Sequence, residues 1–143
     1  MKILIINGPN LNLIGKREPE IYGSESLEDI KNWLISQPEF KNHDIEWFQS
    51  NHEGDIIDKL HHSINKKNGI IINAGALTHY SYSLRDAISS INIPTIEVHL
   101  SDINNRESFR KNSVIKDVCF NQISGQGKKG YLIGIKLLLD QLN

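Results

Sequence analysis

The chain opens with the aliphatic run Ile3-Leu4-Ile5-Ile6, which ends at Asn7, and Gly69-Ile70-Ile71-Ile72-Asn73 later repeats this design. A short aliphatic run that stops at a polar residue is typical of a strand buried on both faces. Such strands form parallel sheets, because helices then cover both faces of the sheet. The two segments therefore predict an α/β fold.

The segments around these runs complete the same alternation. Further strands are predicted at residues 43–50, 94–100 and 117–123. Helices are predicted at residues 26–35, 53–67, 82–90, 107–112 and 129–142, with Ser26 and Ser81 as N-caps and Gly69 as the stop of the second helix. The whole pattern predicts a flavodoxin-like, doubly wound five-stranded parallel sheet in a three-layer α/β/α sandwich.

Length and composition predict one catalytic domain over residues 1–143. A chain of 143 residues can bury a continuous core without disulfides or a structural metal. Its 16 Lys and Arg residues nearly balance its 17 Asp and Glu residues, which gives a formal charge of −1. This balance argues against nucleic acid or an anionic membrane as a partner and favours small-molecule chemistry.

The single cysteine and the first residues of the chain bear on the cellular compartment of the protein. Cys119 cannot form an internal disulfide and lies in the run Val118-Cys119-Phe120, so we expect a buried, inert thiol in a reducing, cytoplasmic setting. Four consecutive aliphatic residues near the start are too few for a signal-peptide core or a membrane span. We therefore expect no export signal.

A long polar segment, residues 7–23, follows the first strand directly and supplies Asn10, Asn12, Arg17 and Tyr22. Ligands of open α/β sheets bind beyond the carboxyl ends of the strands, where this segment begins. Long loops that carry such side chains are often functional. We therefore predict that residues 7–23 form an active-site lid.

Polar residues also end the strands that neighbour the first one in a flavodoxin-like sheet. They should face one crevice, because the carboxyl ends of these strands lie together. The expected group comprises Asn7, Asn10, Asn73, His79, His99 and Ser101. Amide and imidazole groups that meet at three strand ends indicate a binding or catalytic site.

Arg110 follows the fourth strand and can bring positive charge to this crevice. An arginine keeps its charge and offers paired N–H donors that match a carboxylate or phosphate. We expect Arg110 to act on one anion together with the backbone amides of Leu100 and Ser101, and we expect Arg106 and Lys111 to be surface charges. The site is therefore predicted to take an acidic, hydroxylated substrate.

Other ligands of this fold class suit the sequence less well. A flavin mononucleotide would need a phosphate loop rich in glycine and hydroxyl groups, which Asn7-Gly8-Pro9-Asn10 is not. A phospho-acceptor domain would need acidic strand ends to hold magnesium. The candidate metal ligands His61, His62, His79 and His99 lack a suitable spacing and a carboxylate or cysteine cluster. We therefore expect neither a metal nor a cofactor.

Several motifs agree in order and spacing with one family along almost the whole chain. They are Gly8-Pro9-Asn10-Leu11-Asn12-Leu13-Ile14-Gly15, Arg17-Glu18-Pro19, Tyr22-Gly23, Asn73-Ala74-Gly75-Ala76-Leu77-Thr78-His79-Tyr80-Ser81, Leu84-Arg85-Asp86-Ala87, Glu97-Val98-His99-Leu100-Ser101, Arg106-Glu107, Phe109-Arg110, Ser113, Ile123-Ser124-Gly125-Gln126-Gly127 and Gly130-Tyr131. Together they resemble the signature of type II 3-dehydroquinate dehydratases, the type II dehydroquinases of the shikimate pathway.

The resemblance implies a cofactor-free lyase that dehydrates 3-dehydroquinate to 3-dehydroshikimate by anti elimination through an enolate. Tyr22 would take the proton alpha to the ketone, Arg17 would help to activate Tyr22, and His99 would protonate the departing hydroxyl. Asn10 would position groups near the enolate. The resemblance further implies a dodecamer built from trimers. The substrate-binding groups would be Asn73, His79, Arg110, the amides of Leu100 and Ser101, and Asp86 of a neighbouring subunit.

The residue types suit this chemistry. Removing a proton alpha to a ketone needs a strong base and a means of stabilising the enolate. Lowering the pKa of a tyrosine by about 2–3 units requires a preference of about 3–4 kcal/mol for the anion, and Arg17 on the same segment as Tyr22 is a plausible source. Glu97 shares a strand face with His99 and is expected to act through water or to contact the oligomer.

The chain departs from the family pattern at three positions. Ala74 stands where proline is usual, Asp102 where asparagine is common, and Asn121 where glycine is frequent. None of these differences removes a proposed catalytic group. An alternative function for the same fold is a non-enzymatic module that binds an anionic metabolite through Arg110 and the neighbouring amides.

Overall fold

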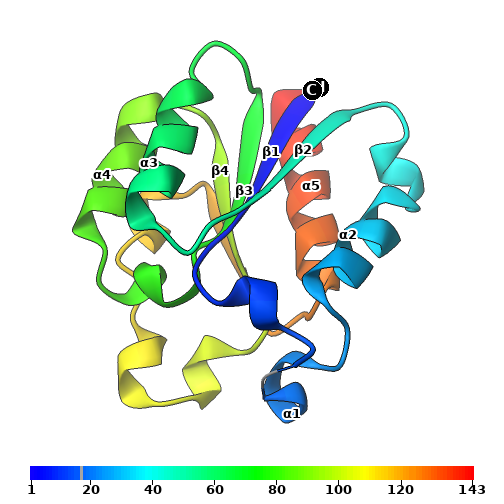
Figure 1. Cartoon of the computed structure of the whole chain (residues 1–143). Helices are drawn as coiled ribbons and strands as arrows, with labels where there is room; N and C mark the ends of the chain where they lie inside the picture. The colour runs from blue at the N-terminus through cyan, green and yellow to red at the C-terminus, as the bar shows by residue number, and fades with distance from the viewer. Residues whose placement is uncertain (17) are drawn as a thin grey trace.

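A single five-stranded parallel sheet forms the centre of the structure, which is a computed structural model. The structure describes residues 1–16 and 18–143, and it describes Tyr22 by its backbone alone. The strands are β1 (Lys2–Asn7), β2 (Asp44–Gln49), β3 (Gly69–Asn73), β4 (Thr95–His99) and β5 (Asn121–Ser124). They lie in the order β2-β1-β3-β4-β5 (Figure 1). This is the flavodoxin-like order, so the predicted fold class is confirmed.

Helices cover both faces of the sheet, with α2 and α5 on one side and α3 and α4 on the other (Figure 1). The α-helices are α1 (Pro19–Tyr22), α2 (Leu27–Ile35), α3 (Glu53–His62), α4 (Tyr82–Ile91) and α5 (Lys129–Leu142). The 3₁₀ helices are η1 (Leu11–Leu13), η2 (Pro38–Phe40), η3 (Gly75–His79), η4 (Ile103–Asn105), η5 (Ser108–Lys111) and η6 (Lys116–Val118). In the described part of the chain, no helix is long and apolar enough to cross a membrane.

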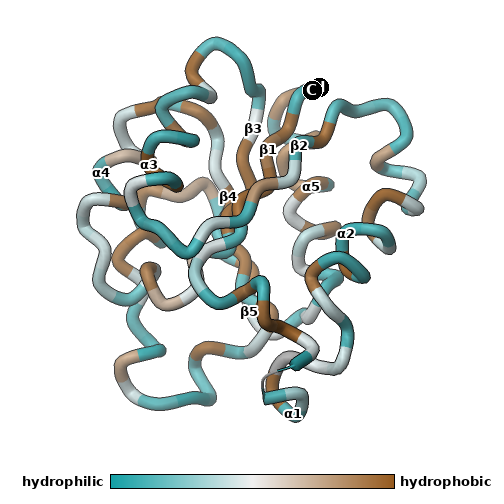
Figure 2. Tube along the Cα trace, in the orientation of Figure 1, coloured by the Kyte–Doolittle hydropathy of each residue, from teal (hydrophilic) through white to brown (hydrophobic). Residues whose placement is uncertain are grey.

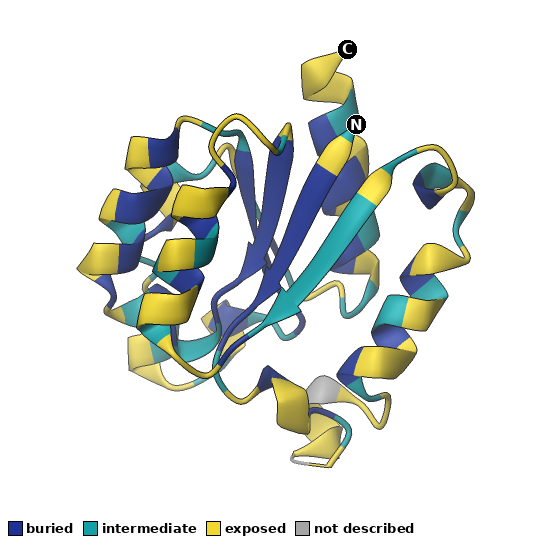
Figure 3. Cartoon of the chain, turned by 45° about the horizontal axis from the view of Figure 1, so that its top comes forward, coloured by how far each residue is buried: buried dark blue, intermediate teal, exposed yellow. Residues whose placement is uncertain are grey.

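The aliphatic strands divide the core into two clusters. Ile3 and Ile5 pack with residues of α2 and α5, whereas Leu4 and Ile6 pack with residues of α3 and α4. This division follows from the strand period, because successive side chains point to opposite faces of the sheet. Figure 2 shows the apolar colour concentrated in the strands, and Figure 3 shows β1 and β3 buried while β2 at the edge is half-buried. The sheet is therefore buried on both faces, as the first aliphatic run predicted.

Several helix boundaries follow the local sequence signals. The Ser26 hydroxyl accepts a hydrogen bond from the Asp29 backbone N–H at 3.1 Å, and the Asp29 carboxylate accepts one from the Ser26 N–H at 3.0 Å. This reciprocal capping box starts α2 at Leu27. The Ser81 hydroxyl likewise accepts from the Leu84 N–H at 3.0 Å at the start of α4. Both predicted N-caps are confirmed.

The predicted helix over residues 53–67 is too long, because α3 ends at His62. The Ser63 hydroxyl donates to the Lys59 carbonyl at 2.9 Å, and Asn65 adopts a left-handed conformation with φ 60°. An asparagine tolerates this conformation and so allows the chain to turn. Gly69 is therefore the first residue of β3 and does not stop the helix, which corrects the prediction.

The predicted fifth strand at residues 117–123 is displaced, because β5 begins at Asn121. The preceding residues form η6, and Val118 and Cys119 pack against the core cluster of α3 and α4. The Phe120 N–H donates to the Thr95 carbonyl at 2.7 Å, which sets where the strand can join β4. Cys119 is half-buried, less than predicted, and burial raises the pKa of its thiol.

The segments that leave β1 and β3 approach each other unusually closely. The Gly8 N–H donates to the Asn73 carbonyl at 2.8 Å. A Cβ atom added at Gly8 would lie 2.4 Å from the carbonyl oxygen of Ala74. Only glycine therefore fits at position 8 without a shift of the backbone around Asn73.

We expect Gly8→Ala to lower the free energy of unfolding by about 1–3 kcal/mol, because the new methyl group collides with backbone that cannot move freely. Gly54→Ala is the matched control, since a Cβ at Gly54 in α3 would meet no atom within 4 Å. Alanine favours a helix, so the free energy of unfolding of the control should stay unchanged or rise by up to about 1 kcal/mol. Denaturant unfolding measures both values, and equal stability of the two variants would contradict the expectation.

Candidate active site

A pocket lies at the carboxyl ends of β1, β3 and β4, where the order of the strands reverses. Its lining comes from three segments that follow these strands. The residues are Pro9, Asn10 and Leu11 after β1, Asn73, Gly75, Ala76 and His79 at and after the end of β3, and His99, Leu100, Ser101, Ile103, Arg106 and Arg110 at and after the end of β4. The structure thus brings together most of the side chains that the sequence placed at these strand ends.

Asn7 does not face this pocket, which corrects its predicted position. Its side chain is fully buried, and its Oδ1 atom accepts a hydrogen bond from the Tyr131 hydroxyl at 2.5 Å. Asn7 shares a sheet face with Ile3 and Ile5, whose side chains point toward α2 and α5, and the hydrogen bond to Tyr131 holds its side chain on that side. Asn7 therefore lies behind the pocket, on the side of α5.

Three other predicted residues are not among the described residues that line the pocket. Asp86 is exposed on α4 and does not line it. Arg17 lies outside the described residues, and Tyr22 is described by its backbone only, as the last residue of α1. Their predicted roles therefore stay predictions.

The predicted lid is partly ordered by its own apolar side chains. Leu11 and Ile14 are buried against the core cluster of α2 and α5. Asn10 begins η1 in a left-handed conformation with φ 68°, and its N–H donates to Asn51 Oδ1 at 2.9 Å. Asn10 is thus held by backbone contacts beside the pocket, whereas Asn12 is exposed and lies outside the pocket lining.

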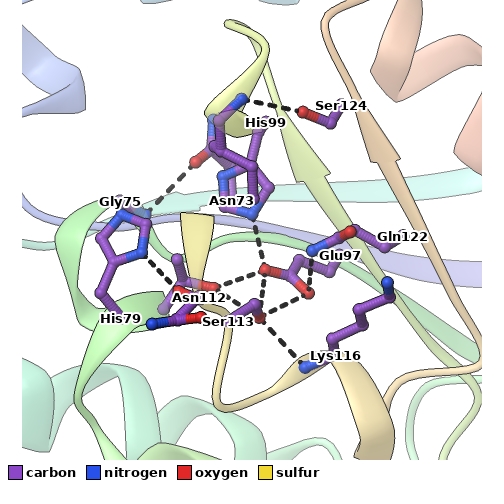
Figure 4. A network of polar contacts seen from close by, with 12 residues as sticks. Asn73, Gly75, His79, Glu97, His99, Asn112, Ser113, Lys116, Gln122 and Ser124 are labelled. Atoms are coloured by element: carbon purple, nitrogen blue, oxygen red, sulfur yellow. Dashed lines mark hydrogen bonds and ion pairs between the residues drawn. The ribbon is translucent and has the colours of Figure 1, made fainter. Parts of the chain in front are cut away.

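His99 and Glu97 form a direct pair under the pocket (Figure 4). They lie two residues apart on β4, so the strand period points both side chains to one face. The Nε2 atom of His99 lies 2.6 Å from Oε1 of Glu97. This contact orients the ring and places a proton on Nε2, so that Nδ1 can serve a molecule in the pocket.

The carboxylate of Glu97 is fully buried and receives hydrogen bonds from several segments (Figure 4). Thr78 donates to it at 2.5 Å, Ser113 at 2.7 Å and Gln122 at 3.1 Å, in addition to His99. Burial acts to raise the pKa of Glu97, but the hydrogen bonds from His99, Thr78 and Ser113 outweigh it and hold the pKa below its usual value. Glu97 is therefore an internal anion that its own chain encloses completely, so the predicted contact with an oligomer is wrong.

His79 presents a neutral ring to the pocket. Burial lowers the pKa of His79, and the nearby positive charge of Arg110 acts in the same direction. Its Nδ1 atom lies 2.7 Å from the carbonyl oxygen of Asn112, so Nδ1 carries the proton and donates it there. The Nε2 atom of His79 is then an acceptor suited to a hydroxyl group of a bound molecule.

Arg110 supplies positive charge to the pocket near His79. Its Nε atom donates to Glu107 at 2.5 Å, and its guanidinium lies 4.7 Å from the centre of the Phe109 ring. Phe109 in turn meets His79 edge to face, with 5.7 Å between ring centres. These contacts hold the guanidinium at the pocket, where it can bind an anion.

Arg106 also lines the pocket, which corrects its prediction as a surface charge. Only 11 % of its side chain is exposed, and its guanidinium lies 3.9 Å from the carboxylate of Glu18. Lys111 next to Arg110 is exposed, as predicted. The sequence carries no signal that separates Arg106 from Lys111, because the short 3₁₀ helices η4 and η5 in this segment have no regular period that a pattern could reveal.

The chemistry of the pocket is that of a site for a polar acid. Amide, imidazole and guanidinium groups surround it, and they match hydroxyl and carboxylate groups. Among residues 1–16 and 18–143, no group of three or more His, Cys, Asp or Glu side chains is placed to hold a metal ion. The described donors therefore suit direct binding of a hydroxylated anion.

Comparison with known proteins points to one family. The family model described as "Dehydroquinase class II" matches residues 1–139. A protein from Caldicellulosiruptor bescii named 3-dehydroquinate dehydratase is 53 % identical over 143 residues, which cover 99 % of each chain. The crystal structure of a type II dehydroquinase from Butyrivibrio crossotus superposes with a TM-score of 0.94 at 52 % identity over 97 % of each chain. The crystal structure of a type II dehydroquinase from Propionibacterium acnes superposes with a TM-score of 0.92 at 35 % identity, over 97 % of this chain and 96 % of that chain.

We expect Glu97→Gln to reduce the loss of stability in acid. The lowered pKa keeps Glu97 ionised in the folded chain, so its stabilising effect is complete above its ordinary pKa of 4.5 and is lost as the pH falls through the folded value. Denaturant unfolding at a series of pH values should therefore show a shallower acid decline for the variant than for the wild type.

The control for this measurement is Glu39→Gln. Glu39 pairs with Lys136 at 2.9 Å at the surface, and its pKa is also lowered, chiefly by that contact. Solvent screens this pair, so its removal should leave the acid decline close to that of the wild type. The same pH dependence in both variants would argue against a special role of the buried carboxylate.

Proposed function

Because the chain belongs to the class II dehydroquinase family, we propose that it dehydrates 3-dehydroquinate to 3-dehydroshikimate, a step of the shikimate pathway. The observation that carries the proposal is the 53 % identity, over 99 % of both chains, to a protein named 3-dehydroquinate dehydratase. The pocket supports it independently, because its donors suit an acid that carries hydroxyl groups.

Substrate binding is assigned to the described side chains of the pocket. Arg110 would bind the carboxylate together with the backbone amides of Leu100 and Ser101. The free acceptor of His79 and the amide of Asn73 would bind hydroxyl groups on the same ring. Arg106 lines the same pocket and would add a second positive charge near the lid segment.

His99 is assigned as the general acid. In the elimination the bond between carbon and the leaving hydroxyl breaks, and the oxygen takes a proton so that water departs. The Nδ1 atom of His99 would supply this proton, while Nε2 keeps its hydrogen bond to Glu97 at 2.6 Å. The fixed carboxylate then stabilises the ring in the required orientation throughout the step.

Tyr22 and Arg17 are assigned by family resemblance as the base and its activator. A tyrosinate can take the proton alpha to the ketone, and the resulting enolate is then stabilised by polar groups near Asn10. A guanidinium near the phenol favours its anion over the neutral form. Closure of the segment over the substrate would also exclude water and strengthen the polar contacts in the pocket.

The proposal includes the assembly implied by the family, a dodecamer built from trimers. Asp86 is exposed on α4 and outside the pocket of its own chain, so it is free to reach the site of a neighbouring subunit. In a closed symmetric assembly each kind of interface is repeated identically, so each copy would give and receive the same residue. The mass of the purified protein in solution tests this part directly.

The function is tested by incubating the purified protein with 3-dehydroquinate. Dehydration creates an enone, so the ultraviolet absorbance should rise. The proposal also includes a cytoplasmic location and independence from cofactors. Because no metal ion is then required, a chelator in the buffer should leave the rate unchanged. A folded protein that produces no absorbance change would refute the enzyme and favour the module that only binds an anionic metabolite.

Tyr22→Phe should lower kcat by about 10²–10⁴-fold with substrate binding largely kept, because only the base is removed. Tyr82→Phe makes the same chemical change at a tyrosine that is exposed on α4, and it should leave kcat unchanged. Steady-state kinetics on both variants provide the comparison. A near-normal kcat for Tyr22→Phe would remove this residue from the role of base.

A further inference from the structure

A buried phenol connects the back of the pocket to the last helix. Tyr131 on α5 is fully buried, and its hydroxyl lies 2.5 Å from Oδ1 of Asn7 and 3.3 Å from Nδ2 of Asn73. Asn7 and Asn73 are register partners at the ends of β1 and β3. Tyr131 therefore touches, in one hydrogen-bond network, the last residues of the two strands that meet at the switch point.

The direction of these hydrogen bonds follows from one backbone group. The N–H of Gly75 can only donate, and it lies 3.3 Å from Oδ1 of Asn73 (Figure 4). The amide of Asn73 must therefore turn its Nδ2 atom to Tyr131, so the Tyr131 oxygen accepts from it. The hydroxyl hydrogen of Tyr131 is then directed to Oδ1 of Asn7.

The opposite arrangement would place donor against donor. If Tyr131 donated to Asn73, the Nδ2 atom of Asn73 would have to face the N–H of Gly75, and both groups would lose a partner. Burial raises the pKa of Tyr131, so the phenol keeps the proton that it must donate. The chain of bonds therefore runs one way, from Gly75 through Asn73 and Tyr131 to Asn7.

The network destabilises the folded protein at Asn7, its last residue. The Nδ2 atom of Asn7 is buried and has no hydrogen-bond partner among the described residues. An unpaired buried amide destabilises a folded protein, whereas apolar side chains of similar shape at both positions would avoid the cost. Packing of the core alone thus gives no reason for a polar network at this place.

The network controls how the side-chain amide of Asn73 is oriented toward the pocket. With one Nδ2 hydrogen bound to Tyr131 and one Oδ1 lone pair bound to Gly75, the amide keeps one donor and one acceptor for a molecule in the pocket. The side chain is almost fully buried, so its remaining groups have a single fixed orientation. A flip of the amide would exchange the donor and the acceptor.

We propose that Tyr131 is a positioning residue that holds the amide of Asn73 in the orientation in which it binds the substrate. The proposal rests on the proposed dehydratase function for its kinetic consequences. Tyr131 itself does not line the pocket and acts only through Asn73.

Tyr131→Phe tests this, because it removes the hydroxyl and keeps a ring that can pack against Trp47 at 5.7 Å between ring centres. We expect kcat/KM for 3-dehydroquinate to fall about tenfold, chiefly through KM, which is the effect of one misaligned hydrogen bond. Ile135→Val is the matched control. It shortens another fully buried side chain of α5, so it should lower Tm and leave both kinetic constants unchanged.

A double-mutant cycle shows whether Tyr131 acts through Asn73. In the Asn73→Ala background, Tyr131→Phe should cause no further fall in kcat/KM, because the amide that it positions is absent. An unchanged kcat/KM of Tyr131→Phe alone would overturn the proposal. An equal fall in both backgrounds would also overturn it, because Tyr131 would then act by another route.

A second measurement does not depend on turnover or on the folding of Asn73→Ala. In protein labelled with ¹⁵N at asparagine, hydrogen exchange of the Asn73 side-chain amide should be faster in Tyr131→Phe than in the wild type and in Ile135→Val. Equal exchange rates in all three proteins would overturn the positioning role. Absence of wild-type turnover with faster exchange in the variant would instead refute the dehydratase function and retain the positioning of Asn73.

Discussion

The close approach of the backbone after β1 to the backbone after β3 is the constraint on which the site depends. Gly8 donates to the carbonyl of Asn73 at 2.8 Å and leaves no room for a side chain beside Ala74. This contact brings the two strand ends together at the point where the sheet reverses its order. It thereby sets Asn73 between the pocket in front and Tyr131 behind.

A buried carboxylate supports the other half of the site. Glu97 receives hydrogen bonds from His99 on its own strand, from Thr78 after β3, from Ser113 after η5 and from Gln122 on β5. These contacts tie together segments that are distant in the chain, and together they offset the cost of burying a charge, which is very unfavourable when unpaired. The anion that orients the imidazole of His99 thus also fixes the walls of the pocket.

Local pattern was sufficient for the fold class and for most helix starts. The aliphatic runs at residues 3–6 and 69–73 indicated buried parallel strands, and the N-caps Ser26 and Ser81 marked their helices. The two errors had different causes, a local turn at the end of α3 and tertiary contacts before β5. Residues 63–67 continue an apparently helical pattern but turn at Asn65. Residues 117–120 have a strand-like composition, but Val118 and Cys119 pack against the core cluster of α3 and α4.

By itself, the sequence determined the α/β fold, the family and the strand ends that carry Asn73, His79 and His99, because periodicity and motif spacing are local properties of the chain. Only the tertiary structure decided how these side chains are used. It turned Asn7 away from the pocket, brought Arg106 into it, and placed Tyr131 behind Asn73. Asn73 and Tyr131 are 58 residues apart, and such a contact exists only once the helix packs on the sheet.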